Sequence, residues 1–289
     1  MEYYALILLS VVMFGGCFAL NDVFRRMCGS SLRISLYYTF FSTLAGLAVL
    51  LAVNRFRVEF TPFTLLMAAL CSLNSIAFTF CSFRALSRIN LSLYSLFSML
   101  GGMLLPFVLG ILCYGEGMSL AKGVCIVTLT AALAVTVERS EKKHRGGRIY
   151  YIGIFVLNGM SGVLTQIFTK APFAKTSAAG YSILAAALTV LLTGGISLAL
   201  AVKHGRLGIS LRAHLVGCAS GAASRVANYF LVIALAFVHG SVQYPMVTGG
   251  TIIVSTAICF LGKSKPSRRE LVSVALAFLG VLSLVLIPI

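Results

Sequence analysis

The sequence predicts an all-α integral membrane protein of about ten transmembrane helices, arranged as two inverted five-helix repeats. Three observations lead to this fold class. The mean hydropathy is +1.00, and only 10% of the 289 residues are charged. Apolar stretches of membrane-spanning length fill almost the whole chain. The two halves of the chain also resemble each other weakly, as described below.

Ten apolar segments follow one another, each close to the roughly 20 residues that a helix needs to cross a bilayer. Each segment is expected to be a helix, because an open sheet edge cannot exist in lipid. A β-barrel would show short alternating segments, whereas these are continuous apolar runs. The segments are 3–23, 33–53, 62–83, 90–113, 119–137, 149–169, 179–202, 213–237, 241–262 and 271–289.

Short loops separate these segments and hold nearly every charge in the chain. The first segment follows Glu2 and lacks the basic region and cleavage site of a signal peptide, so we expect it to remain in the protein. The tightest junctions lie at 84–90 and 239–240. A charged linker separates the first five segments from the last five, which divides the chain into repeats 1–138 and 149–289 and a linker 139–148.

The positive charge of the chain predicts its orientation rather than a nucleic-acid partner. The formal net charge is +16, but the basic residues lie in short loops beside apolar segments. Of the 23 Lys and Arg residues, 17 lie in loops on one side, 5 on the other, and Arg225 falls inside a segment. The positive-inside rule makes the larger set cytoplasmic, which places both termini outside.

No motif in the chain predicts an enzyme, a cofactor or a metal site. Seven of the 8 cysteines fall inside apolar segments without a Cys-x-x-Cys pair, which is typical of small packing residues. The 4 histidines are scattered near segment ends without metal-ligand spacing. Neither a phosphate-binding loop nor a nucleophile elbow occurs.

The two halves match each other at an offset near 149 residues. Five segments per half is an odd number, so the second half enters the membrane with the opposite orientation, as in many secondary transporters. Chance alignment of apolar, Gly-rich sequence is the alternative, but several short matches at a nearly constant offset favour a repeat. The matches are Tyr3-Tyr4 with Tyr150-Tyr151, Ala85-Leu86 and Ser92 with Ala234-Leu235 and Ser241, and Gly101-Gly102 with Gly249-Gly250.

This pattern resembles the EamA repeat of the drug/metabolite transporter superfamily. In that repeat a segment ending in Ala-Leu leads into a helix rich in Ser and Leu, then a Gly-Glu turn, then a last helix. The second half departs at Lys263, where the family usually has Glu. The first half carries the pattern as Phe83-Arg84-Ala85-Leu86, Ser92-Leu93-Tyr94-Ser95-Leu96, Pro106, Gly115-Glu116 and the stretch from Gly123; the second carries Ala234-Leu235, Ser241, Pro245 and Gly262.

The resemblance covers the whole chain and implies ten helices in two inverted bundles around a cavity. It also implies transport of amino acids, other metabolites or drugs by alternating access. Members of the family are usually drawn with cytoplasmic termini, which disagrees with the orientation expected from the charge count.

Polar residues inside the segments are the candidates for substrate binding, because they are costly in lipid and usually face a cavity or another helix. In segment 149–169 they recur on one helical face, at positions 158, 161, 162, 165, 166 and 169. Small and hydroxyl residues also pack helices together, as in Gly217-x-x-x-Gly221. The candidate substrate-binding residues are Arg225, Asn158, Asn74, Gln166, Asn228 and Tyr229.

Arg225 lies near the middle of segment 213–237, where an arginine costs about 2.5–3.5 kcal/mol on insertion scales. It therefore needs a partner or water. One interpretation is a cation in a transport cavity that meets an anionic group of the cargo. The other is a structural arginine bonded to carbonyl groups or a carboxylate. Asp22, at the end of its segment beside Arg25 and Arg26, is expected to form a surface ion pair.

These observations predict a multi-pass transporter of small metabolites in the plasma or bacterial inner membrane, which moves its cargo by alternating access. Its partners are a small-molecule substrate and the lipid bilayer; a homo-oligomer stays open. Because no segment has a carboxylate at mid-depth, cationic-drug/proton antiport is disfavoured, and zwitterionic or anionic solutes such as amino acids are favoured. The alternatives are a multidrug exporter with an aromatic cavity (Phe14, Phe78 and Tyr229), an integral-membrane enzyme and a non-transporting scaffold.

The charge count predicts that the linker is cytoplasmic. A single cysteine at Ser140, in a variant without native cysteines, should react with an impermeant maleimide only after the cells are opened, because the linker carries five basic residues in positions 138–148. Labelling of intact cells would show that the chain has the opposite orientation.

Overall fold

The computed structural model describes residues 2–88, 91–115, 119–121, 123–128, 131–132, 148–205, 207–235, 237–238, 240–261 and 268–286. Within these ranges it contains nine bounded helices and no strand. Residues 120–121, 123–128 and 131–132 are also helical and fall in the expected segment 119–137. The helices are α1 (Glu2–Cys28), α2 (Leu32–Val53), α3 (Pro62–Leu86), α4 (Leu91–Tyr114), α6 (Arg148–Lys170), α7 (Ala178–His204), α8 (Leu211–Leu235), α9 (Gly240–Leu261) and α10 (Arg268–Leu286).

The prediction of a helical protein with apolar, membrane-spanning segments is confirmed. Seven helical stretches of the described chain are long and apolar enough to cross a membrane; they lie in α1, α2, α3, α4, α6, α7 and α8. Shorter apolar stretches lie in α9 (Met246–Phe260) and α10 (Leu271–Gly280). The count of ten and the inverted repeat stay predictions, because segment 119–137 is described only in part. The linker 139–148 lies outside the described residues except for Arg148, where α6 begins.

Helix α1 continues beyond the expected end at residue 23 because its charged last turn is paired internally. The Asp22 carboxylate forms ion pairs with two arginines one helical turn further on. Its oxygens lie 2.8 Å from Nη2 of Arg25 and 2.7 Å from Nη2 of Arg26. The expected ion pair is therefore present, but its placement on the surface was wrong, since Asp22 is buried. On the same turn, Phe24 lies against Tyr38 of α2 and Phe83 of α3, so the end of α1 is packed against two other helices.

Hydroxyl side chains form the N-caps of α2, α3 and α7. Ser31, Thr61 and Ser177 each accept a hydrogen bond from a backbone N–H in the first turn of α2, α3 and α7. The backbone N–H of Ser177 also donates to the Glu59 carboxylate at 2.6 Å, and this hydrogen bond lowers the pKa of that carboxyl. The loop after α2 is thereby attached to the start of α7, in the other half of the chain.

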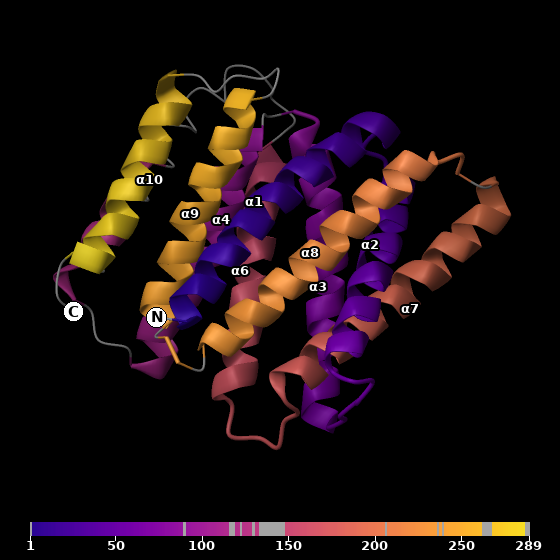
Figure 1. Ribbon diagram of the computed structural model, residues 1–289, viewed down its shortest axis with the longest axis horizontal. Coiled ribbons are helices and arrows are strands. Elements are labelled where there is room, and N and C mark those ends of the chain that lie inside the picture. The colour runs from indigo at the N-terminus through magenta and orange to yellow at the C-terminus, as the bar shows by residue number, and fades with distance from the viewer. Residues whose placement is uncertain are drawn as a thin grey trace.

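Helices from the two halves of the sequence pack against each other throughout the structure. Helix α1 packs mainly on α8 and α9, while α6 packs mainly on α4 and α3. Helix α2 packs on α8 and α7, and α4 also contacts α9. Figure 1 shows the result: α1 (indigo) runs beside α8 and α9 (orange), with α10 at one end of the molecule and α7 at the other. Residues far apart in the sequence therefore meet at the centre.

Two glycines allow backbones of opposite halves to touch. A Cβ atom on Gly221 of α8 would lie 1.9 Å from the carbonyl oxygen of Ser42 in α2. A Cβ atom on Gly101 of α4 would lie 2.0 Å from the carbonyl oxygen of Phe155 in α6. No hydrophobic driving force brings helices together in lipid. Small residues at such crossings let the backbones approach closely, so that van der Waals packing holds the helices together.

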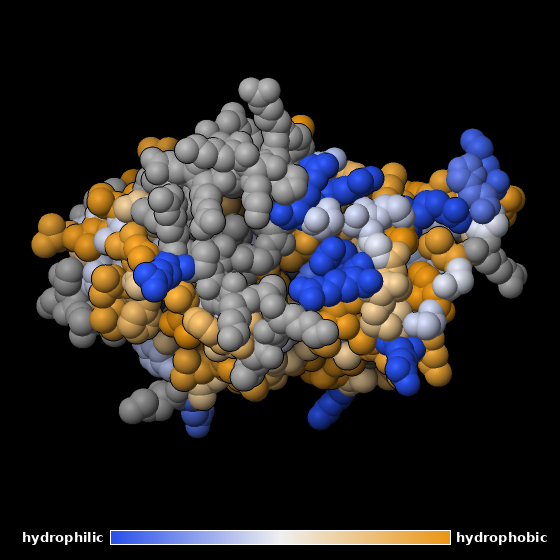
Figure 2. Space-filling model, turned by 90° about the horizontal axis from the view of Figure 1, so that it is seen from above, coloured by the Kyte–Doolittle hydropathy of each residue, from blue (hydrophilic) through white to orange (hydrophobic). Residues whose placement is uncertain are grey.

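Charged residues gather on one end of the helices. Figure 2, which looks down on the upper end of Figure 1, shows hydrophilic residues clustered there between apolar side walls. This end holds the loop from α1 to α2, the last turn of α3 and the loop from α7 to α8. We call it the basic face; its described basic residues are Arg25, Arg26, Arg33, Arg84, Arg88, Lys203, Arg212 and Arg268. The opposite end carries Arg55, Arg57, Lys170 and Lys175.

Gly221→Ala should destabilise the protein by about 1–3 kcal/mol, because the added methyl group must displace the α2 backbone. Thermal unfolding in detergent should show a lower midpoint for this variant. Gly195→Ala in α7 is the matched control, because a Cβ atom there meets open space. Equal midpoints for the two variants would contradict the close α2–α8 crossing.

Candidate functional site

A cavity of about 330 Å³, lined by both polar and apolar side chains, lies between the helices. Every bounded helix except α10 contributes to its wall. The cavity is thus a product of the interlocked packing, since helices of both halves enclose it. Polar side chains between apolar helices are costly unless they face such a cavity or another helix, so this cavity is the candidate functional site.

Arg225 provides the positive charge of the cavity. It lies about 15 Å along α8 from Leu235 and about 21 Å from Leu211, so it is far from both helix ends. Its stem passes Gly46 of α2, where a Cβ atom would lie 2.4 Å from its Cγ. Within the described chain, no hydrogen bond or ion pair holds the guanidinium, although Tyr181 and Cys71 are close enough to interact with it electrostatically. Five N–H donors are therefore available to a ligand or water.

Three asparagines line the same cavity with their amide groups held in a fixed orientation. The Nδ2 atom of Asn74 donates to the carbonyl oxygen of Leu157 at 2.9 Å, and that of Asn158 donates to Ser98 at 2.6 Å. Asn228 donates to Ser224 at 2.8 Å. None of the three Oδ1 atoms accepts a hydrogen bond from a described residue, so each remains free to accept one from a ligand.

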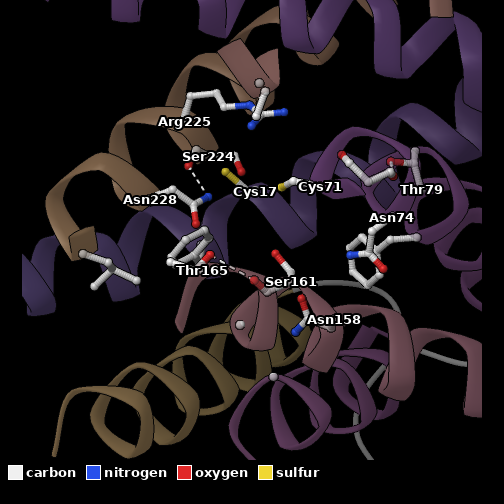
Figure 3. Close-up of a pocket in the computed structure, with 18 of the residues that line it drawn as sticks. Cys17, Cys71, Asn74, Thr79, Asn158, Ser161, Thr165, Ser224, Arg225 and Asn228 are labelled. Carbon is white, nitrogen blue, oxygen red and sulfur yellow. Dashed lines mark hydrogen bonds between the residues drawn. The ribbon is translucent and has the colours of Figure 1, made fainter. Parts of the chain in front are cut away.

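Hydroxyl groups on α3 and α6 extend this acceptor-rich surface. The Thr79 hydroxyl donates to the carbonyl oxygen of Ser75, and the Thr165 hydroxyl donates to that of Ser161, both at 2.9 Å. Their protons point back into the helix, while lone pairs stay available. Figure 3 shows Arg225 on one side of the cavity and Asn74, Asn158 and Ser161 on the other. A ligand between them meets a cation at one end and acceptors at the other.

The structure brings four of the six predicted substrate-binding residues together. Arg225, Asn158, Asn74 and Asn228 all line the cavity. Their role in binding stays a prediction.

Gln166 and Tyr229 are not among the described residues of the cavity wall. Each residue turns an α-helix by about 100°, which places Gln166 about 80° away from Asn158 around α6, at the margin of the predicted polar face. Gln166 is instead buried, and its Oε1 atom has no partner in the described chain. Tyr229 follows Asn228 directly, so its ring turns to another side of α8 and lies 6.5 Å from Phe230.

Sequence reasoning missed the contributions of α2 and α7 to the cavity. Thr39, Ser42 and Thr43 of α2 and Tyr181 and Ser182 of α7 line it. Hydroxyl residues in apolar segments are usually packing residues, so their number alone carried no signal. The spacing of 39, 42 and 43 does place them on one helical face, and that periodicity was the available indication.

A hydrogen-bonded cluster of three side chains lies in the cavity wall. Tyr38 hydrogen-bonds Asn21, and Ser220 bonds both Tyr38 at 2.9 Å and Asn21 at 2.8 Å. All three residues line the cavity, and they join α1, α2 and α8. Asn21 directly precedes Asp22, which pairs with Arg25 and Arg26 in the last turns of α1.

Comparison with known proteins supports the fold alone. No family model matches the chain, and no curated protein matches it. The chain is similar to a solved structure described as "Crystal structure of protein", with a TM-score of 0.62 and 16% sequence identity. The match covers 98% of this chain and 96% of the other. The whole helical arrangement therefore occurs in a second protein of nearly the same length.

Cys71 in the cavity wall should be accessible to a small polar thiol reagent. Cys71 lines the cavity, whereas Cys125 is fully buried in an apolar cluster with Leu100, Met103 and Ile252. The thiolate is the form of cysteine that reacts with such reagents, and it forms more readily where water reaches the sulfur. A variant that keeps only Cys71 should therefore react with a methanethiosulfonate. A variant that keeps only Cys125 should not react in the folded state, as measured by mass spectrometry. Equal labelling of the two cysteines would contradict a hydrated cavity.

Proposed function

We propose that this protein is a secondary transporter of small metabolites, which binds a zwitterionic or anionic solute at Arg225 and moves it by alternating access. The observation that carries this proposal is the guanidinium of Arg225, which has no partner among the described residues and lies in the wall of a cavity between the helices. An arginine at this depth is costly and marks a functional site by default. A carboxylate ligand is the matching partner, because its two oxygens accept bidentate hydrogen bonds from a guanidinium.

The other polar groups of the cavity favour a ligand that also carries donors. One amide N–H of each of Asn74, Asn158 and Asn228 donates to a backbone carbonyl, and each amide oxygen is left to accept a hydrogen bond from a ligand. An ammonium group donates three hydrogen bonds and suits such oxygens. A zwitterion with a carboxylate toward Arg225 and an ammonium toward the asparagines satisfies both sides. Amino acids are therefore the leading substrate class.

The absence of a carboxylate from the described cavity wall bears on the mechanism. A proton/cation antiporter needs an acid that binds cargo and proton in turn, and no described residue of the wall is Asp or Glu. Facilitated diffusion or exchange of solutes fits this wall better than antiport of a cationic drug.

The helix contacts support an inverted repeat of the drug/metabolite transporter type in a cell membrane. Exchanging each helix with the one five places along converts the α1–α8 and α1–α9 contacts into the α6–α3 and α6–α4 contacts, all of which occur. The same exchange converts α2–α8 into α7–α3, which also occurs. A twofold arrangement of this kind lets a central site open to each side in turn.

A multidrug exporter of apolar or aromatic compounds is the second candidate. Phe14, Phe18 and Phe78 line the cavity, so part of its wall is aromatic. Aromatic walls bind planar apolar compounds by stacking and area burial. The two candidates differ in what they require of Arg225, because an uncharged aromatic compound gains nothing from a carboxylate-binding cation.

Arg225→Ala should reduce uptake or exchange of an amino-acid substrate by at least about tenfold in reconstituted vesicles, since a hydrogen bond to a charged group is lost. Arg225→Lys should restore it only partly, because an ammonium cannot bind a carboxylate through two parallel hydrogen bonds. Asn158→Ala should raise the apparent KM with a smaller loss. A screen of radiolabelled amino acids, with and without a pH gradient, identifies the substrate beforehand.

Arg268→Ala, which removes a charge from the exposed start of α10, is the matched control and should transport normally. Size-exclusion profiles establish that each variant is folded. Normal amino-acid transport by Arg225→Ala would overturn the proposal. Unchanged transport of apolar aromatic compounds, with no amino-acid transport by the native protein, would favour the multidrug exporter.

A further inference from the structure

A second hollow lies on the outer side of α2 and α7, away from the central cavity. Its volume is about 490 Å³, and it is bounded by Tyr37, Phe40 and Phe41 of α2 and by Leu198 and Ala201 of α7. On α2 the contributing positions 33, 37, 40 and 41 lie on one helical face, which faces the bilayer beside α7. We call this hollow the α2–α7 groove.

The groove is apolar along its length and positively charged at one end. Arg33 is its charged member, and it lies one residue inside the start of α2, on the basic face. Phe40 is seven residues further along, so the groove runs about 10 Å into the apolar region. The Tyr37 hydroxyl is hydrogen-bonded to His214 of α8, so the groove presents the tyrosine ring rather than a free hydroxyl.

The charged end has unused hydrogen-bond donors. One Nη2–H of Arg33 donates to the carbonyl oxygen of Gly205 at 2.6 Å, which fixes the guanidinium at the end of α7. No described carboxylate pairs with it. Lys203 and His204 precede Gly205, and both are exposed. A guanidinium with remaining N–H donors is a typical binding partner for a phosphate group.

We propose that the α2–α7 groove binds an anionic glycerophospholipid from the leaflet at the basic face. The phosphate contacts Arg33, and one acyl chain lies along Phe40, Phe41 and Leu198. This occupant follows from charge complementarity together with the depth profile. Basic residues beside a membrane attract anionic lipid, and the apolar part of the groove begins directly below them. The proposal is independent of the transport substrate, because the groove and the cavity share no lining residue.

The chain contains no tryptophan, so an introduced tryptophan reports on one place. Leu198→Trp places the reporter in the groove, and Val272→Trp places it on the exposed surface of α10, at the opposite end of the molecule (Figure 1). Each full-length variant is reconstituted with phosphatidylglycerol or phosphatidylcholine whose acyl chains are brominated. Fluorescence quenching in mixtures of brominated and ordinary lipid then gives the relative affinity of each site for the two lipids.

At Leu198→Trp, phosphatidylglycerol should bind about fivefold more tightly than phosphatidylcholine, as expected for one basic residue near the surface. Adding Arg33→Gln should reduce this preference to about one. Arg268→Gln, a charge removal at the same face far from the groove, should leave it unchanged. The Val272→Trp reporter should show no preference in any background.

Equal quenching by both lipids at Leu198→Trp would overturn the proposal and indicate an ordinary lipid-facing surface. Quenching by neither lipid would also overturn it, because the groove would then be closed to lipid. A preference that Arg268→Gln removes as well would assign the effect to the net charge of the basic face rather than to Arg33.

Discussion

The close crossing of helices from opposite halves is the constraint on which the rest of the structure depends. Gly221 brings α8 against the α2 backbone at Ser42, and Gly101 brings α4 against α6. The crossing of α2 and α8 also positions Arg225. This arginine lies one turn after Gly221 on α8, and its stem packs against Gly46 of α2. A larger side chain at any of these positions would separate the two halves, and the cavity between them would change shape.

The cavity is polar in an asymmetric way, and this asymmetry determines what it can hold. Its asparagines donate to backbone carbonyls and therefore present oxygens, while Arg225 presents only donors. In the low dielectric of the membrane, an unpaired cation is costly, so a bound anionic group or water lowers the free energy of the site. The same side chains thus serve packing and recognition, because Asn74 links α3 to α6 and Asn158 links α6 to α4, while each amide oxygen stays available to the ligand.

The central cavity and the α2–α7 groove are two different environments built from the same helices. Helix α2 contributes hydroxyl residues to the cavity on one face and aromatic residues to the groove on the other. Helix α7 likewise contributes to both, with Tyr181 in the wall of the cavity and Leu198 in the groove. A lipid held against these helices on the outside would therefore contact the elements that enclose the transport site, which couples the proposed lipid site to the proposed transport site through α2 and α7.

The sequence by itself determined the helical, membrane-type architecture and the positions of most helices within a few residues, and it singled out Arg225 as a candidate site residue, because hydropathy, periodicity and the cost of a buried charge are local properties. Only the tertiary structure decided which polar residues share the cavity. Asn74, Asn158 and Asn228 lie on three helices, and their meeting depends on crossings at Gly101 and Gly221 that no local pattern encodes. Gln166 is polar in the same segment as Asn158, yet the rotation of α6 turns it away. Burial of Asp22 was likewise decided only by the tertiary structure, because burial depends on how other helices pack around the end of α1.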